Sequence, residues 1–84
     1  MAVGFVLIKT APRAERPVFQ QLLRVPGLLE VFPLFGEYDF VAKLEAKDYD
    51  ELGRAVTARI RSIDGVTKTH TLTVASLGPV TPPR

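Results

Sequence analysis

Cysteine is absent from the 84 residues of this chain, and several kinds of site are excluded with it. Without cysteine there is no disulfide, no thiolate metal site and no cysteine nucleophile. The only histidine, His70, forms no visible arrangement with a serine of the kind that nucleophilic catalysis needs. We expect His70 at a surface or interface. We also expect no catalytic residue, no metal site and no cofactor, so the chain is predicted not to be an enzyme.

Long apolar runs are also missing. No apolar stretch reaches the roughly 18 residues that a transmembrane helix needs. The first apolar stretch, residues 2–8, has no basic region ahead of it and so does not resemble a secretory signal. These absences favour a cytoplasmic protein that does not enter a membrane.

The chain has little excess of charge of either sign. Lys and Arg number 11 against 9 Asp and Glu, for a net charge of +2. The basic residues are scattered, which indicates a solvated surface rather than a track for phosphates. No phosphate loop, GxGxxG fingerprint or zinc-spaced ligand set occurs. RNA-binding domains stack bases on sheet aromatics, but Phe5 and Phe40 have aliphatic neighbours and lack basic companions. We expect no direct nucleic-acid binding.

Four stretches have the composition of β-strands. Residues 2–8 are almost continuously apolar, which predicts a strand buried on both faces. Residues 28–35 are similar, but Pro33 cannot donate to a ladder, so this strand belongs at a sheet edge. Residues 40–46 alternate in polarity, and residues 66–75 are rich in β-branched side chains.

Two helices are predicted between these strands. The first has Pro17 in its first turn, where proline is tolerated, and it must end before Pro26. Asp48 begins the second as its N-cap, Glu51 follows three residues later as in a capping box, and Gly65 ends it. The acidic residues here could suggest a cation site, but capping and the helix dipole already account for them.

The resulting order, βαββαβ, predicts an α+β domain of the ferredoxin-like sandwich type. In this fold a four-stranded antiparallel sheet carries both helices on one face, with residues 2–8 and 40–46 in the central strands. Residues 1–77 are expected to form this one domain. Residues 78–84 have no periodicity and are expected to be an extended or disordered tail.

Apolar residues are predicted on both faces of the sheet, although helices cover only one. Residues 2–8 are apolar at odd and even positions alike, and residues 28–35 repeat this pattern. A bare apolar face is an association surface. We expect it to pack against the same face of a second copy, giving a homodimer of the dimeric α/β-barrel type. The alternative is a core strand with small exposed residues.

Four motifs follow one another at characteristic separations. They are Pro26-Gly27-Leu28, the turn Gly36-Glu37-Tyr38-Asp39, the helix beginning at Asp48, and Gly65-Val66-Thr67-Lys68-Thr69-His70-Thr71. Together they resemble the effector-binding (RAM) domain of the leucine-responsive regulator (Lrp/AsnC) family, over residues 2–75. The resemblance implies dimers that join into a ring, commonly an octamer, with small effectors, usually amino acids, bound between dimers.

The resemblance also implies the position of the effector site. The family's Gly-x-Tyr-Asp turn and the hydroxyls of its last strand line the pocket, which here assigns Gly36, Glu37, Tyr38, Asp39, Thr69 and Thr71. Typical members carry an N-terminal helix-turn-helix domain, whereas this sequence begins directly at its first strand. It therefore resembles a stand-alone RAM protein, without DNA binding of its own and with full-length regulators of the family as candidate partners.

The chemistry of the turn suits a zwitterionic ligand. Asp39 could accept from an ammonium group, and the amides of residues 36–38 could donate to a carboxylate. Thr69 and Thr71 point to one side of their strand because they are two residues apart. The structural alternatives are a plain hairpin at the turn and threonines that serve only the β-propensity of an edge strand.

These observations favour a non-enzymatic, oligomeric sensor of a small amino-acid-like effector that regulates transcription or amino-acid metabolism. The alternative is a small dimeric α/β-barrel enzyme, such as a cofactor-free monooxygenase or isomerase. Its cleft would lie inside each subunit, which the expected uniformly apolar sheet face and the isolated His70 disfavour. A purely structural oligomerisation module is a third reading, and only a binding experiment separates it from the first.

Overall fold

The described part of the chain folds into the predicted succession of strands and helices. The computed structural model describes residues 1–74, 82 and 83, so the predicted tail at 78–84 and the predicted domain end at 77 fall largely outside it. The elements are, in chain order, β1 (Ala2–Thr10), α1 (Glu15–Leu22), β2 (Leu28–Pro33), β3 (Phe40–Ala46), α2 (Tyr49–Ala55), η1 (Val56–Ile60) and β4 (Val66–Thr73).

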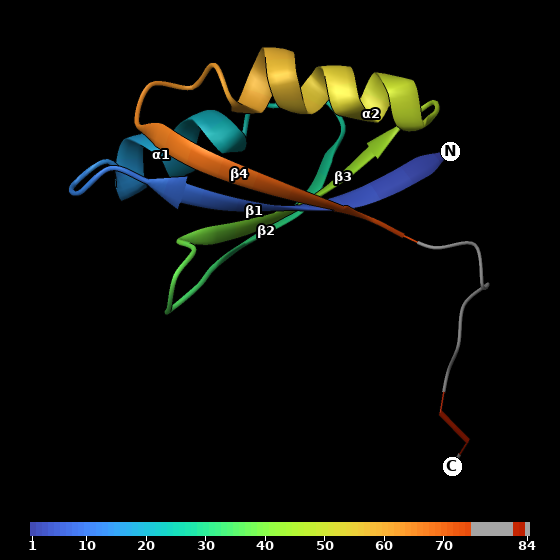
Figure 1. Cartoon of the computed structure of the whole chain (residues 1–84), viewed down its shortest axis with the longest axis horizontal. Coiled ribbons are helices and arrows are strands. Elements are labelled where there is room, and N and C mark those ends of the chain that lie inside the picture. The colour runs from blue at the N-terminus through green and yellow to red at the C-terminus, as the bar shows by residue number, and fades with distance from the viewer. Residues whose placement is uncertain (75–81, 84) are drawn as a thin grey trace.

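The strands form one antiparallel sheet in the order β2-β3-β1-β4 (Figure 1). The prediction that β1 and β3 are central and that β2 and β4 are edges is confirmed. Both helices lie on one side of the sheet, as Figure 1 shows. This is the predicted ferredoxin-like βαββαβ arrangement.

The strand ends differ from the predicted ones. β1 extends to Thr10, two residues beyond its predicted end at 8. β2 ends at Pro33 rather than at residue 35, and the N–H of Leu34 donates to the carbonyl of Asp39 at 2.8 Å at the base of the turn that follows. β4 is described as far as Thr73, and its predicted end at 75 lies outside the described residues.

The core lies between the sheet and the helices. Every second residue of β1, from Ala2 to Thr10, is buried because it points toward the helices. Val6 and Ile8, at the middle of β1, have no exposed surface and pack in one cluster with residues of both helices. The helices contribute to this cluster the buried residues Val18, Leu22, Leu52, Val56 and Ile60. Burying each side chain of this size stabilises the fold by ~1.5–3 kcal/mol.

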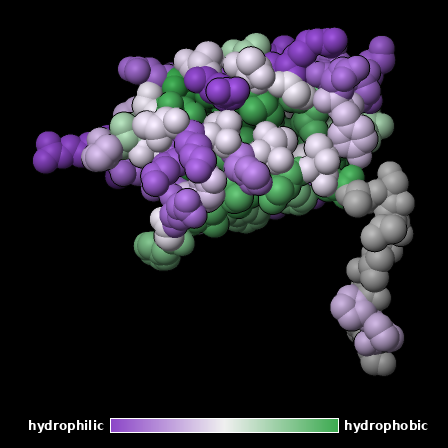
Figure 2. All heavy atoms as spheres, in the orientation of Figure 1, coloured by the Kyte–Doolittle hydropathy of each residue, from purple (hydrophilic) through white to green (hydrophobic). Residues whose placement is uncertain are grey.

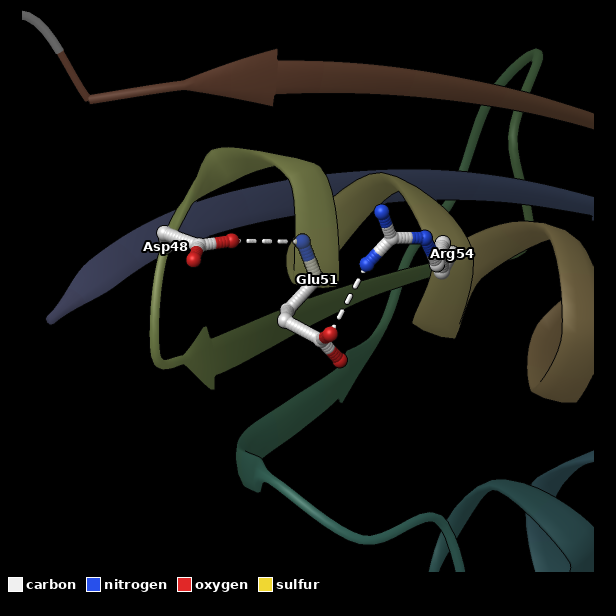
Figure 3. A network of polar contacts seen from close by, with 3 residues as sticks. All are labelled: Asp48, Glu51 and Arg54. Atoms are coloured by element: carbon white, nitrogen blue, oxygen red, sulfur yellow. Dashed lines mark hydrogen bonds and ion pairs between the residues drawn. The ribbon is translucent and has the colours of Figure 1, made fainter.

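The second helix begins as an α-helix at the predicted position and continues as a π-helix. Asp48 Oδ1 accepts a hydrogen bond from the N–H of Glu51 at 2.8 Å, so Asp48 is the N-cap. The Glu51 carboxylate pairs with Arg54 at 2.8 Å rather than returning to the Asp48 backbone as a capping box would (Figure 3). In η1 the helix takes the π form, and the N–H of Arg61 donates to the carbonyl of Val56 at 2.9 Å.

The sheet face away from the helices, the free face, carries apolar and charged side chains together. Residues that pair across the strands share a face, and the register places here Val3, Phe5, Leu7, Lys9, Glu30, Phe32, Val41, Lys43, Glu45, Lys68, His70 and Leu72. Figure 2 shows hydrophobic residues (green) gathered on the side of the body away from the helices.

The expectation of a uniformly apolar free face is wrong. Lys43 Nζ lies 3.8 Å from Glu30 Oε1 and 5.9 Å from the centroid of the Phe5 ring. The cause is the alternation along β3, which turns Ala42 and Leu44 toward the helices and therefore Lys43 away from them.

Candidate functional site

The turn between β2 and β3 projects from the body of the protein (Figure 1). Gly36 has a φ of 127°, a left-handed conformation that glycine adopts without strain. No atom lies within 4 Å of the position that a Cβ on Gly36 would take, so the space beside the turn is open. Phe35 and Glu37, on either side of Gly36, are exposed. The backbone of the turn is therefore accessible to a ligand or to another chain.

Asp39 links the turn to the end of β1. Its Oδ2 accepts hydrogen bonds from the backbone N–H of Thr10 at 2.7 Å and from the Thr10 hydroxyl at 2.9 Å. The N–H of Asp39 donates to the carbonyl of Ile8 at 2.8 Å. One carboxylate oxygen thus has a structural role, which leaves Oδ1 as the oxygen that could accept from a ligand.

Tyr38 connects the turn with β4. Its side chain is half-buried, and Lys68 Nζ lies 5.9 Å from the centroid of its ring. This distance is within the range of a cation–π interaction. Lys68 was not among the residues predicted for the site. The sequence offered one signal for its position. Lys68 lies between Thr67 and Thr69 in a strand, so the alternation of side chains turns Lys68 to the opposite face from Thr69.

Thr69 and Thr71 share one face of β4, as their spacing predicts. They pair with Ile8 and Val6 of β1, which point toward the helices. The two threonines therefore lie on the helix side of an edge strand, and β1 separates this strand from β3. Within one subunit the structure brings Tyr38 close to Lys68, whereas Thr69 and Thr71 stand on the other side of the sheet from Lys68.

A hollow beside β4 includes one of the predicted residues. It is lined by Arg61, Val66, Thr67, Lys68 and Thr69. The Thr67 hydroxyl donates to the carbonyl of Lys9 at 3.2 Å. The hollow is thus bordered by two cationic residues and by hydroxyl groups, a lining that suits an anionic or strongly polar ligand.

Two of the acidic residues at the start of α2 form local contacts. Asp48 caps the helix and Glu51 pairs with Arg54, as Figure 3 shows. This agrees with the interpretation of these residues as helix-capping groups. Among the described residues, no helix is long and apolar enough to span a membrane.

Comparison with known proteins gives consistent matches. The sequence model of the Lrp/AsnC ligand binding domain matches residues 3–77. An uncharacterised HTH-type transcriptional regulator of Pyrococcus horikoshii is 38% identical over 72 residues, which cover 82% of this chain and 48% of that protein. The chain spans about half the length of the Pyrococcus regulators it matches.

Solved structures share the fold. A protein of Thermus thermophilus superposes with a TM-score of 0.87 at 34% identity, covering 95% of this chain and 100% of that one. A transcriptional regulator of Neisseria meningitidis, solved as a complex with L-Met, has a TM-score of 0.81 at 21% identity, covering 95% of this chain and 53% of that one.

Proposed function

Because this chain belongs to the Lrp/AsnC ligand-binding domain family, we propose that it is a non-enzymatic, oligomeric sensor of a small amino-acid-like effector. The observation that carries the proposal is the family match, which extends over nearly the whole chain, residues 3–77. The curated relatives from Pyrococcus species are named transcriptional regulators, which supports a regulatory role in transcription or amino-acid metabolism. The protein would act in the cytoplasm, with full-length regulators of the family as candidate partners.

The proposed assembly begins with a homodimer through the apolar middle of the free face, which leaves Lys9 and Lys68, near the end of β1 and the start of β4, outside the interface. Phe5, Leu7 and Val41 are only partly covered in the single chain, so a second copy would remove further apolar surface from water. Dimers would then join into a ring of the octamer type. A small subunit buries a limited share of its surface alone, which makes association a natural source of stability.

The proposed effector site is the turn Gly36-Glu37-Tyr38-Asp39, at the seam between dimers. Thr69 and Thr71 would reach the ligand from a neighbouring subunit, because in their own subunit they lie on the opposite face of β4 from Lys68, the residue that approaches Tyr38. The Neisseria regulator that shares this fold was solved with an amino acid bound, which supports this ligand class. An effector that binds only in the assembled seam shifts the assembly equilibrium by its differential affinity.

Isothermal titration calorimetry against the twenty amino acids tests the proposal, with sedimentation velocity on the same samples. We expect at least one amino acid to bind and to change the distribution of oligomers. Tyr38→Ala should weaken that binding about tenfold or more, since it removes the aromatic wall of the turn. Tyr49→Ala is the matched control, because Tyr49 is the second tyrosine of the chain and lies on α2. This variant should bind the amino acid as the unmodified chain does. No binding by any amino acid at millimolar concentration would contradict the proposal.

A further inference from the structure

Two lysines lie side by side on adjacent strands, near the end of β1 and the start of β4. Lys9 on β1 pairs directly with Lys68 on β4, and both are exposed. Like charges placed directly opposite each other destabilise a strand pair. The ion pairs formed within residues 1–74 are Lys43 with Glu30 and Arg54 with Glu51, so neither lysine is neutralised by a carboxylate there.

Lys68 brings this positive charge to the turn. Its Nζ lies 5.9 Å from the centre of the Tyr38 ring, which belongs to the proposed effector site. A third cation, Arg61, borders the hollow that also includes Lys68 and Thr69. Cationic groups therefore lie on both sides of the first half of β4.

The two carboxylates of the turn, Asp39 and Glu37, form no ion pair with these cations in the described structure. Asp39 gives its Oδ2 to Thr10. Glu37 is exposed in the turn. Lys68, which approaches the turn, and Lys9, which pairs with it on β1, thus form no ion pair with a carboxylate among the residues that the structure describes. Unbalanced cations beside an open turn are an arrangement that an anionic ligand would stabilise.

We propose that the effector carries a net negative charge, as an amino acid with a carboxylate side chain does, and that Lys68, supported by Lys9, binds this second carboxylate. The inference rests on the proposed function and names the class of effector. An ammonium group supplies donors without acceptors, and its charge-assisted hydrogen bonds to a carboxylate are stronger than neutral ones. A neutral amino acid has no second carboxylate to offer and leaves the lysine pair uncompensated.

Two pairs of nearly isosteric probes test the inference by calorimetry. L-glutamate is compared with L-glutamine, and L-aspartate with L-asparagine, because each pair differs in charge but hardly in shape. We expect the acidic member of at least one pair to bind about tenfold or more tightly than its amide. The advantage should shrink as salt is raised, since the ions of the solution screen exposed charges.

Lys68→Gln should reduce the preference for the acidic probe to about a twofold difference or less, because the acidic probe loses far more affinity than the amide does. Lys47→Gln is the matched control, since it removes one exposed lysine from the other end of β3 and should keep the preference. Thermal unfolding of both variants is the check that each remains folded. Amides that bind as tightly as their acids in both pairs, or a neutral amino acid preferred over both acids, would overturn this inference alone. No binding of any amino acid would overturn the proposed function with it.

Discussion

The Asp39 carboxylate fastens the turn between β2 and β3 to the end of β1. Thr10 is only 8% exposed, so its backbone N–H and its hydroxyl depend on Asp39 Oδ2 rather than on water. The two residues are 29 positions apart in sequence, and their contact therefore also fixes how the end of β1 meets the start of β3. A residue expected to serve a ligand thus also holds the site in place.

Replacing Asp39 should lower stability. Asp39→Ala leaves two buried donors of Thr10 unpaired, and we expect a loss of about 1–3 kcal/mol in the free energy of unfolding. Thr10→Val keeps the backbone hydrogen bond and removes only the hydroxyl, so its cost should be smaller, about 1 kcal/mol. Urea denaturation measures both.

The control for Asp39 is Glu37→Ala in the same turn, where the side chain is exposed and a change of less than about 0.5 kcal/mol is expected. Equal stability of the Asp39 and Glu37 variants would show that the Asp39 carboxylate does not support the fold.

The start of α2 depends on a single capping contact. Asp48 has an extended backbone, with φ of −150°, and its carboxylate accepts from the N–H of Glu51. The first N–H groups of a helix have no partner within the helix, so this bond satisfies one of them. Because α2 follows β3 after only two intervening residues, 47 and 48, its cap also sets where the second helix begins to cover the sheet.

Asp48→Ala should destabilise the domain by about 1 kcal/mol through loss of the cap. Asp50→Ala provides the matched comparison, since Asp50 lies in the first turn of the same helix and contributes through its charge. Its loss should cost less, about 0.3–1 kcal/mol, and that cost should diminish at high salt. Thermal denaturation at low and high salt distinguishes the two. A salt-dependent loss of the same size in both variants would mean that Asp48 acts by its charge alone.

At the scale of the whole molecule, the free face determines how copies can meet. The ion pair between Lys43 and Glu30 and the contact of Lys43 with Phe5 place a charge among apolar side chains. Burying such a pair together is tolerable, whereas burying one partner alone is costly. A partner surface must therefore cover the apolar residues and leave this ion pair intact or hydrated, which favours one mode of packing over others.

A charge placed at the middle of the free face should prevent association. Leu7 pairs with Val41 on one side and with His70 on the other, so Leu7→Arg would bring an unpaired cation into the proposed interface. We expect a monomer in sedimentation velocity at micromolar concentration, with an unchanged circular dichroism spectrum.

The control for Leu7→Arg is Thr57→Arg, which adds the same side chain at an exposed position on the helix layer and should leave the oligomer intact. An oligomer that survives Leu7→Arg would place the interface elsewhere.

Much of this architecture follows from the sequence because the patterns involved are local. Continuous apolar runs, alternation of polarity in residues 40–46 and β-branched side chains in residues 66–75 predicted the strands. Pro33 indicated an edge strand, and Asp48 indicated the start of a helix. The order of elements then limited the fold to the ferredoxin-like sandwich. The alternation of residues 40–46 also indicated that Lys43 points away from the helices. The expectation of a uniformly apolar free face did not take this lysine into account.

Tertiary structure alone decided which residues meet across the sheet. The contact of Asp39 with Thr10, the approach of Lys68 to Tyr38 and the pairing of Lys9 with Lys68 all join different strands. Their partners depend on the register between strands, and a shift of one residue would turn every side chain to the other face. The composition of each strand can be read from the sequence. The positive charge beside the turn depends on the pairing of β1 with β4, which brings Lys9 next to Lys68.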